Sequence, residues 1–235
     1  MTKVAYITGG SKGIGLGIAA AMLQEGMNVA ISGRNIDALQ EALRTLSGTA
    51  KGKILAIASD VRTYEDEQAA IEKVLENWGR LDVCIANAGV GKFAPIEELS
   101  TEDWNGVIDT NLTGVFHTVK ASIPALKSSK GYIITIASLA GTNFFKRGAA
   151  YNASKFGLVG FTQAIMLDLR AYGIKVSTIM PGSVATHFNG HTPSDADAWK
   201  IQPEDIGQMV MDLLKMNPRT LPSKVEVRPS IPVKR

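Results

Sequence analysis

The sequence reads Thr8-Gly9-Gly10-Ser11-Lys12-Gly13-Ile14-Gly15 directly after the apolar run Val4–Thr8. Three of the glycines in this segment stand where an expected strand turns into an expected helix. Glycine adopts the positive φ angles of tight turns and lets a phosphate group come close to the backbone. The free N–H groups at the start of the following helix also favour an anion. The segment therefore predicts a phosphate-binding loop, and an ordinary flexible loop is the alternative.

Around this loop, short apolar runs alternate with longer segments of helical periodicity. The expected strands are Val4–Thr8, Asn28–Ser32, Lys53–Ala58, Val83–Ala86, Gly131–Ile136, Val176–Met180 and Lys224–Val227. The expected helices lie near Ile14–Gln24, Ile36–Leu46, Glu65–Trp78, Thr101–Leu126, Ala150–Ala171 and Pro203–Met216. The apolar runs are continuous, as in strands buried on both faces. The pattern predicts one α/β domain over residues 1–235, a Rossmann-type doubly wound parallel sheet of about seven strands with helices on both faces.

The glycine spacing is T-G-x-x-x-G-x-G rather than the common G-x-G-x-x-G, and it resembles that of the short-chain dehydrogenase/reductase family. The resemblance recurs in order along nearly the whole chain, at Asp60-Val61, Asn87-Ala88-Gly89, Asn111, Ser138, Tyr151-x-x-x-Lys155 and Pro181-Gly182. It implies a nicotinamide-dependent oxidoreductase similar to 3-oxoacyl-ACP reductase-like members. One departure is Ala86, where the family usually has an asparagine.

The end of the second expected strand favours NADP(H) over NAD(H). In dinucleotide-binding folds an acid there bonds the ribose 2′-hydroxyl, whereas an arginine accommodates a 2′-phosphate. Here the strand ends Ile31-Ser32-Gly33-Arg34-Asn35, without an acid at the deciding positions. A guanidinium binds a phosphate through two hydrogen bonds and stacks on a base, and Lys12 supplies a second cation. The alternative for both residues is a solvated surface charge.

The resemblance also implies roles for single residues. Asp60 would contact the adenine amine beside Val61, and Asn87, Ala88 and Gly89 would lie under the adenosine ribose. After the sixth strand, Val184 and Thr186 would contact the nicotinamide carboxamide. The full set of expected cofactor contacts is Gly9, Ser11, Lys12, Gly13, Ile14, Gly15, Arg34, Asp60, Val61, Asn87, Ala88, Gly89, Tyr151, Lys155, Pro181, Gly182, Val184 and Thr186.

The expected chemistry centres on Tyr151 and Lys155, which share one face of a helix because they are four residues apart. A free tyrosine titrates near pH ~10, and a neighbouring ammonium is expected to lower the pKa of Tyr151 toward the working pH. Ser138 follows a strand at its carboxyl end, where sites gather, and can hold a carbonyl oxygen. By resemblance, Asn111 holds a water that links Lys155 to solvent. The alternatives are a chance helix-face pair, a turn serine and a helix-surface asparagine.

We therefore expect NADPH to deliver hydride to a carbonyl carbon while Tyr151 supplies the proton, with oxidation of a secondary alcohol as the reverse reaction. By resemblance, Lys155 also bonds the nicotinamide ribose. A dinucleotide-binding regulator or scaffold without catalysis is the alternative, because fold alone never proves function.

The substrate stays open at this stage. A lid is expected at Ser183–Gln202, and Phe144, Phe188 and Trp199 are candidates for an apolar pocket wall, with packing into the scaffold as the alternative. His187 is expected to face solvent rather than the pocket. A 3-oxoacyl thioester, a xenobiotic ketone, an aldehyde and a sugar-derived ketone all remain candidates.

The balance of residues limits the other classes of function. The net charge of +3 comes from scattered side chains, so we expect no nucleic-acid partner, although a basic protein raises that alternative. No apolar stretch reaches the length of a membrane span, and no signal peptide fits the amino terminus, so we expect a cytoplasmic protein. The single cysteine, Cys84, is expected to be a buried strand residue rather than a catalytic thiol.

Two further expectations concern metals and assembly. The three histidines, His117, His187 and His191, lack a metal-ligand pattern, so we expect no metal. The helices Thr101–Leu126 and Ala150–Ala171 carry additional apolar residues, namely Val115, Val119, Phe161 and Ile165. By resemblance these helices would form a symmetric homo-oligomer, a dimer or a tetramer. The last residues, Pro232-Val233-Lys234-Arg235, are expected to be disordered.

Overall fold

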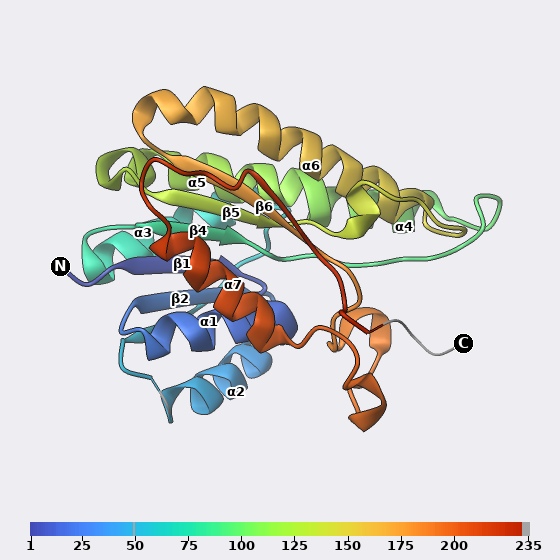
Figure 1. Cartoon of the computed structure of the whole chain (residues 1–235), viewed down its shortest axis with the longest axis horizontal. Coiled ribbons are helices and arrows are strands. Elements are labelled where there is room, and N and C mark those ends of the chain that lie inside the picture. Colours follow the sequence, from blue (N-terminus) through green and yellow to red (C-terminus); the bar gives the residue numbers. More distant parts are fainter. Residues whose placement is uncertain (49, 232–235) are drawn as a thin grey trace.

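The computed structural model, which describes residues 1–48 and 50–231, is a parallel sheet covered by helices on both faces (Figure 1). The expectation for 232–235 lies outside the described residues. The seven strands run in the order β3-β2-β1-β4-β5-β6-β7, with all neighbours parallel. They are β1 Val4–Thr8, β2 Asn28–Gly33, β3 Ile54–Ala58, β4 Val83–Ala86, β5 Tyr132–Ile136, β6 Lys175–Pro181 and β7 Lys224–Val227. The predicted doubly wound α/β fold is confirmed.

The α-helices are α1 Gly13–Gln24, α2 Ile36–Ser47, α3 Tyr64–Trp78, α4 Thr101–Ile108, α5 Gly114–Ser129, α6 Ala149–Leu169 and α7 Pro203–Lys215. The π-helix η1 spans Asp109–Thr113, and the short 3₁₀ helices are η2 Leu139–Gly141, η3 Arg170–Tyr172, η4 Phe188–Gly190 and η5 Asp195–Asp197. In Figure 1, α1, α2 and α7 lie on one side of the sheet and α3, α5 and α6 on the other. Strand order reverses beside β1, where β2 lies on one side and β4 on the other. This is the place where such sheets bind ligands.

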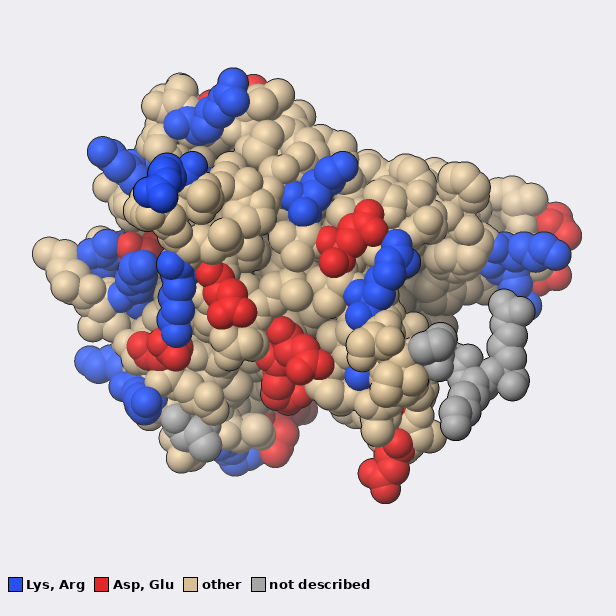
Figure 2. All heavy atoms as spheres, in the orientation of Figure 1, with Lys and Arg blue, Asp and Glu red and all other residues tan. Residues whose placement is uncertain are grey.

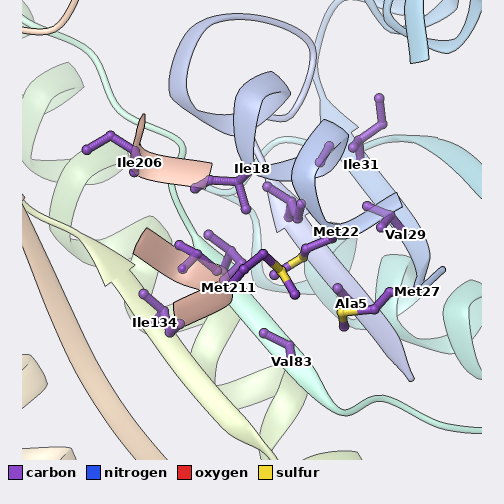
Figure 3. Close-up of a cluster of buried hydrophobic side chains, with 14 of the residues drawn as sticks. Ala5, Ile18, Met22, Met27, Val29, Ile31, Val83, Ile134, Ile206 and Met211 are labelled. Atoms are coloured by element: carbon purple, nitrogen blue, oxygen red, sulfur yellow. The ribbon is translucent and has the colours of Figure 1, made fainter. Parts of the chain in front are cut away.

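Two apolar clusters cover the two faces of the sheet. Figure 3 shows the first, in which Ile18 and Met22 of α1 meet Ile206 and Met211 of α7 over the strands. The second packs α3, α5 and α6 against the opposite face. Full burial of one such aliphatic side chain contributes ~1.5–3 kcal/mol to the stability of the fold. Because each cluster buries many of these side chains, the sheet and the ends of its strands are held in place.

The single helix predicted over Thr101–Leu126 is wrong in one respect. The segment is α-helical at both ends, but η1 interrupts it, and α5 continues to Ser129. A π turn carries one extra residue, and that changes which side chains face the sheet. The expectation that Val115 and Val119 are additional apolar residues, free to form an oligomer interface, is also wrong, because both are buried against the chain's own sheet.

The surface carries mixed charge. Figure 2 shows Lys and Arg side chains interspersed with Asp and Glu side chains over the face in view. Within the described residues, no helix has both the length and the apolar character needed to cross a membrane.

Candidate active site

The glycine loop between β1 and α1 has the predicted backbone. Gly9 has a φ of 64° and Gly13 a φ of 55°, in the left-handed region that side chains with a Cβ rarely adopt. Gly15 is buried in the first turn of α1, where an added Cβ would collide with the carbonyl oxygen of Gly9. Because these residues have no side chains, the backbone of the loop lies at the surface of a cleft, and no side chain of Gly13 or Gly15 covers the start of α1.

A hydrogen-bonded bracket joins this loop to the end of β4. The Thr8 hydroxyl accepts from the backbone N–H groups of Asn87 (3.0 Å) and Ala88 (3.1 Å). The Asn87 amide donates to the carbonyls of Thr8 (2.9 Å) and Gly9 (3.1 Å). The side chain of Asn87 therefore holds the glycine loop against the end of β4. Ala86, which stands where the family usually has an asparagine, is fully buried in the sheet. Thr8 belongs to the glycine motif, but its place in the sequence does not indicate this bracing role.

Two adjoining clefts lie along the carboxyl ends of the strands. The first, called here the Tyr151 cleft, has a volume of about 440 Å³. The second, the Arg34 cleft, has a volume of about 850 Å³. Both are bordered by the glycine loop and by Phe188. Of the predicted cofactor and catalytic residues, all line one cleft or the other except Gly15 and Asn111.

The Arg34 cleft carries the residues predicted to choose the cofactor. Arg34 and Lys12 are exposed along its wall, and Asp60 and Val61 lie in the same wall. The Asp60 carboxylate accepts two bonds of 3.0 Å from Arg62 Nε. Arg62, together with the more distant Arg34, holds the pKa of Asp60 below its usual value, although partial burial opposes this. Asp60 is thus a fixed, ionised group at the end of β3.

The Tyr151 cleft brings together Ser138, Tyr151 and Lys155, as predicted. Ser138 follows β5; its hydroxyl accepts from the N–H of Ala140 (3.1 Å) and donates to the carbonyl of Pro181 (3.4 Å). Lys155 is only 4% exposed, and its Nζ donates to the carbonyl of Ile136 (3.0 Å). The same Nζ lies 5.7 Å from the centroid of the Tyr151 ring.

The expected net direction of the Tyr151 pKa shift is wrong in this structure. Burial raises the pKa of Tyr151, and a hydrogen bond with Ser138 offsets this only in part. Burial also lowers the pKa of Lys155 to about 8. The physical reason is desolvation: Lys155 is buried and Tyr151 is partly shielded in the cleft wall, so water stabilises their charged forms less. At neutral pH Tyr151 is therefore a protonated phenol, and Lys155 is still mostly an ammonium.

Asn111 lies in the π-helix and is completely buried. Its Oδ1 accepts from the N–H of Val90 (2.8 Å), and its Nδ2 donates to the Val90 carbonyl (2.9 Å) and to Ser154 Oγ (3.1 Å). Both N–H groups of the side-chain amide therefore donate to protein acceptors. A water held by Asn111, as the resemblance implies, would have to bond an atom of Asn111 other than Nδ2. Oδ1 and Lys155 Nζ lie 3.3 and 3.7 Å from the point where a Cβ of Gly89 would be. Asn111 is thus next to Lys155, although it does not line the cleft.

The predicted lid, Ser183–Gln202, is tied to itself by the bridge between Val184 and Ile201. Asp197 accepts from His191 Nε2 and from Lys200 Nζ, each at 2.6 Å. Lys200, followed by His191, keeps the pKa of Asp197 far below its usual value. His187 is exposed, as expected, but it lines both clefts.

The three aromatic candidates for the pocket wall have different locations. Phe188 lines both clefts. Phe144 is 83% exposed and stacks on Phe156, and Trp199 lies beside Lys200 rather than in a cleft wall. Phe93, which lies edge-on to Tyr151, was missed because nothing in its neighbourhood in the sequence marks it. Within residues 1–48 and 50–231, no group of three or more His, Cys, Asp or Glu side chains is arranged to hold a metal.

Comparison with known proteins gives three kinds of match. A family model described as short chain dehydrogenase matches residues 3–197. An uncharacterized oxidoreductase of Staphylococcus saprophyticus is 32% identical over 228 residues, which cover 97% of each chain. The alcohol dehydrogenase of the archaeon Thermococcus sibiricus, solved with 5-hydroxy-NADP, has a TM-score of 0.93 at 29% identity and covers 100% of both chains. A metagenomic short-chain oxidoreductase in complex with NADP has a TM-score of 0.85 at 33% identity over 98% of both chains.

Proposed function

The chain belongs to the short-chain dehydrogenase family, and on this premise we propose that it interconverts a carbonyl compound and a secondary alcohol, with Tyr151 as the general acid and base. It is an NADP(H)-linked oxidoreductase. The observation that carries the proposal is the meeting of Ser138, Tyr151 and Lys155 in one cleft that adjoins the glycine loop.

The residues of the two clefts fit NADP(H). The glycine loop offers a backbone surface that a Cβ would fill, and it opens a helix whose N–H groups favour a diphosphate. Arg34, with Lys12 beside it, would hold the 2′-phosphate in the Arg34 cleft. Val184 and Thr186 in the Tyr151 cleft would hold the nicotinamide carboxamide, and Lys155 would bond the adjoining ribose. When bound, the reduced cofactor supplies the hydride that the substrate carbon receives.

The chain's own residues would handle the proton. Ser138 and Tyr151 would both bond the substrate oxygen, because both residues line the Tyr151 cleft and their side chains are within hydrogen-bond reach of each other. Because burial raises the pKa of Tyr151, the phenol holds its proton at neutral pH, as a donor for carbonyl reduction must. The Lys155 ammonium, held at the carbonyl of Ile136, would stabilise the phenolate left after transfer.

The proposal is tested by following NADPH and NADH oxidation with a panel of ketones, aldehydes and a 3-oxoacyl thioester. We expect turnover with NADPH that falls about 10²–10⁴-fold in Tyr151→Phe, because one proton donor is removed. This variant should still bind NADPH, as measured by fluorescence, because the other expected cofactor contacts remain. A Tyr151→Phe variant with near wild-type turnover would refute the role of the phenol. Tight NADPH binding without turnover on any carbonyl would favour the non-catalytic regulator.

We also propose a cytoplasmic homo-oligomer. The outer faces of α5 and α6 leave several large apolar side chains exposed, namely Phe116, Phe156 and Leu167, and Phe116 packs edge-on against Phe161. Such faces on neighbouring helices suit a symmetric dimer or tetramer. Light scattering at the mass of one chain would refute the oligomer. Cell fractionation tests the location, which is consistent with a buried free thiol at Cys84.

A further inference from the structure

Phe188 lies where the two clefts meet. It belongs to the predicted lid, Ser183–Gln202, and together with His187 it lines both the Tyr151 cleft and the Arg34 cleft. The glycine loop and the segment that follows β4 also border both clefts. A cofactor that extends from one cleft into the other would therefore lie along this shared border, next to Phe188.

The ring of Phe188 rests on the backbone at Gly91, which we call its seat. The point where a Cβ of Gly91 would be lies only 2.6 Å from Cζ and 2.7 Å from Cε1 of Phe188. Carbon atoms pack at about 3.5–4.0 Å, so the ring occupies space that any other residue at position 91 would need. The centroid of this ring also lies 5.6 Å from that of Tyr151 and 6.4 Å from that of Phe93. The seat thus joins the lid to the segment that follows β4.

The tip of the lid, residues 187–190, is exposed to solvent. Two hydrogen bonds of this tip stay within the lid: Phe188 N–H donates to Thr186 Oγ1 and His191 N–H donates to the carbonyl of Phe188, each at 3.3 Å. Asn189 has a φ of 55°, in the left-handed region that asparagine adopts more readily than most residues. The seated ring of Phe188 therefore anchors an exposed, tightly turned tip to the body of the protein.

The base of the lid is held by polar contacts of its own. The N–H of Ala185 donates to the carbonyl of Ile201 (2.9 Å), and the N–H of Ile201 donates to the carbonyl of Ser183 (3.1 Å). Asp197 holds the far part of the lid through its two ion pairs. Loss of the Phe188 ring should therefore free the tip and leave the base of the lid folded.

We infer that Phe188 is a latch, which holds the tip of the lid over the border of the two clefts while its ring is seated on Gly91. NADP(H) enters and leaves when the ring lifts from this seat. The inference rests on the proposed position of NADP(H) along both clefts, but not on the proton chemistry of Tyr151. Opening of a lid commonly limits how fast a bound molecule is exchanged. A latch that makes the same contact in the free and in the loaded protein slows entry and release by the same factor and leaves the affinity unchanged.

The test measures the rate constants of NADPH association and dissociation by stopped-flow fluorescence, without a carbonyl substrate. Phe188→Leu removes the Cζ and Cε1 atoms that rest on the seat, so both rate constants should rise about 3–10-fold, the effect of losing an aromatic contact. The Kd should change less than about twofold. The matched control is Phe144→Leu, because Phe144 is an exposed phenylalanine outside both clefts, and both rate constants should stay at the wild-type values.

Gly91→Ala tests the seat itself. Its methyl group would displace the ring of Phe188, so this variant should also raise both rate constants about 3–10-fold. The φ of Gly91 is not positive, so alanine can adopt the same backbone. In Gly91→Ala/Phe188→Leu no ring is left to displace, and the rate constants should match those of Phe188→Leu within about twofold. The control is Gly106→Ala, because a Cβ at Gly106 would meet nothing within 4 Å.

Several results would overturn the latch. Faster dissociation alone, with a weaker Kd, would show that Phe188 is a cofactor contact, and unchanged rate constants would show that its ring does not limit exchange. Effects that multiply in the double variant would show that the methyl group at position 91 acts elsewhere, on Phe93 or on the cofactor. Absence of NADPH binding to the wild type would overturn the cofactor position together with the latch. Because no carbonyl takes part, a failure of the proposed Tyr151 chemistry would leave this test unaffected.

Discussion

The Tyr151 cleft and the Arg34 cleft adjoin each other but hold their functional groups in opposite ways. In the first, Lys155 is 4% exposed and is bonded to the backbone of β5. In the second, Arg34 and Lys12 are exposed to solvent at the ends of loops. The first cleft changes the pKa of its groups by burial, as for Tyr151 and Lys155. The second offers hydrated cations that act through their charge.

Because of this difference, we expect substitutions in the two clefts to change different measured quantities, the reaction rate in one case and the choice of cofactor in the other. A buried group with an altered pKa and a fixed hydrogen bond affects the rate of a proton transfer. An exposed cation affects which ligand binds, and salt weakens it. The comparison would fail if substitutions in the Tyr151 cleft changed only cofactor choice or if substitutions in the Arg34 cleft changed only the rate.

The largest expected effect is that of Lys155→Met, which keeps the buried stem but removes the ammonium. We expect kcat to fall about 10²-fold or more, because the phenolate of Tyr151 loses its cation. In the wild type, the pKa of about 8 means that Lys155 loses its charge as the pH rises through this value. The rate of carbonyl reduction should therefore fall above about pH 8, and the variant should lack this alkaline limb.

The matched control for this prediction is Lys175→Met. Lys175 Nζ lies 5.9 Å from the Tyr132 ring, a geometry close to that of Lys155 and Tyr151, but outside both clefts. Its pH–rate profile should match that of the wild type. An alkaline limb that persists in Lys155→Met would assign the titration to another group.

The next effect is a change of cofactor preference in Arg34→Glu. We expect the ratio of kcat/KM for NADPH to that for NADH to fall about 10–100-fold, because a charge-assisted contact worth ~1.5–3 kcal/mol becomes a repulsion. The ratio is measured at low and high salt, and the loss should be smaller at high salt. Arg219→Glu makes the same change of charge at an exposed position outside both clefts and should leave the ratio unchanged. A ratio that survives in Arg34→Glu would show that Arg34 is an idle surface charge.

The smallest effect concerns a buried acid behind the Arg34 cleft. Glu67 Oε1 accepts from the hydroxyls of Tyr6 (3.0 Å) and Ser59 (2.6 Å), and Ser59 lines that cleft. Glu67 Oε2 is the buried side-chain oxygen of the described residues that lacks a hydrogen-bond partner. Burial raises the pKa of Glu67, and the neighbouring hydroxyls offset this only in part.

Because the pKa of Glu67 is higher in the folded than in the unfolded chain, its protonated form stabilises the fold. This contribution is complete below the unfolded pKa and is lost as the pH rises through the folded pKa. Glu67→Gln, which resembles the protonated acid, should therefore gain free energy of unfolding relative to the wild type as the pH rises above the ordinary pKa of a glutamic acid, as measured by urea unfolding. Glu72→Gln, an exposed acid on the same helix, is the control. A difference that does not change with pH would show that Glu67 has an ordinary pKa.

The sequence by itself predicted what local geometry dictates. Each expected strand is found, and central runs such as Val4–Thr8 are fully buried, as continuous apolar strands of a parallel sheet covered on both faces are expected to be. The glycine loop was predictable because Gly9 and Gly13 can adopt the positive φ angles that the turn requires. Tyr151 shares a helix face with Lys155 because the two are four residues apart. These features depend on neighbours within a few residues along the chain.

The tertiary structure decided what depends on segments far apart in the sequence. The π-helix was not predicted, because the groups that bond the Asn111 side chain, the backbone of Val90 and the hydroxyl of Ser154, are 21 and 43 residues away. The hydroxyl of Tyr6 reaches Glu67 across 61 residues, and the rings of Phe93 and Phe188 meet that of Tyr151 from separate segments of the chain. Burial also reversed the expected direction of the Tyr151 pKa, since a charge pair judged from spacing alone carries no information about desolvation. Spacing along the chain sets which face a side chain occupies, whereas packing sets how much water remains around it.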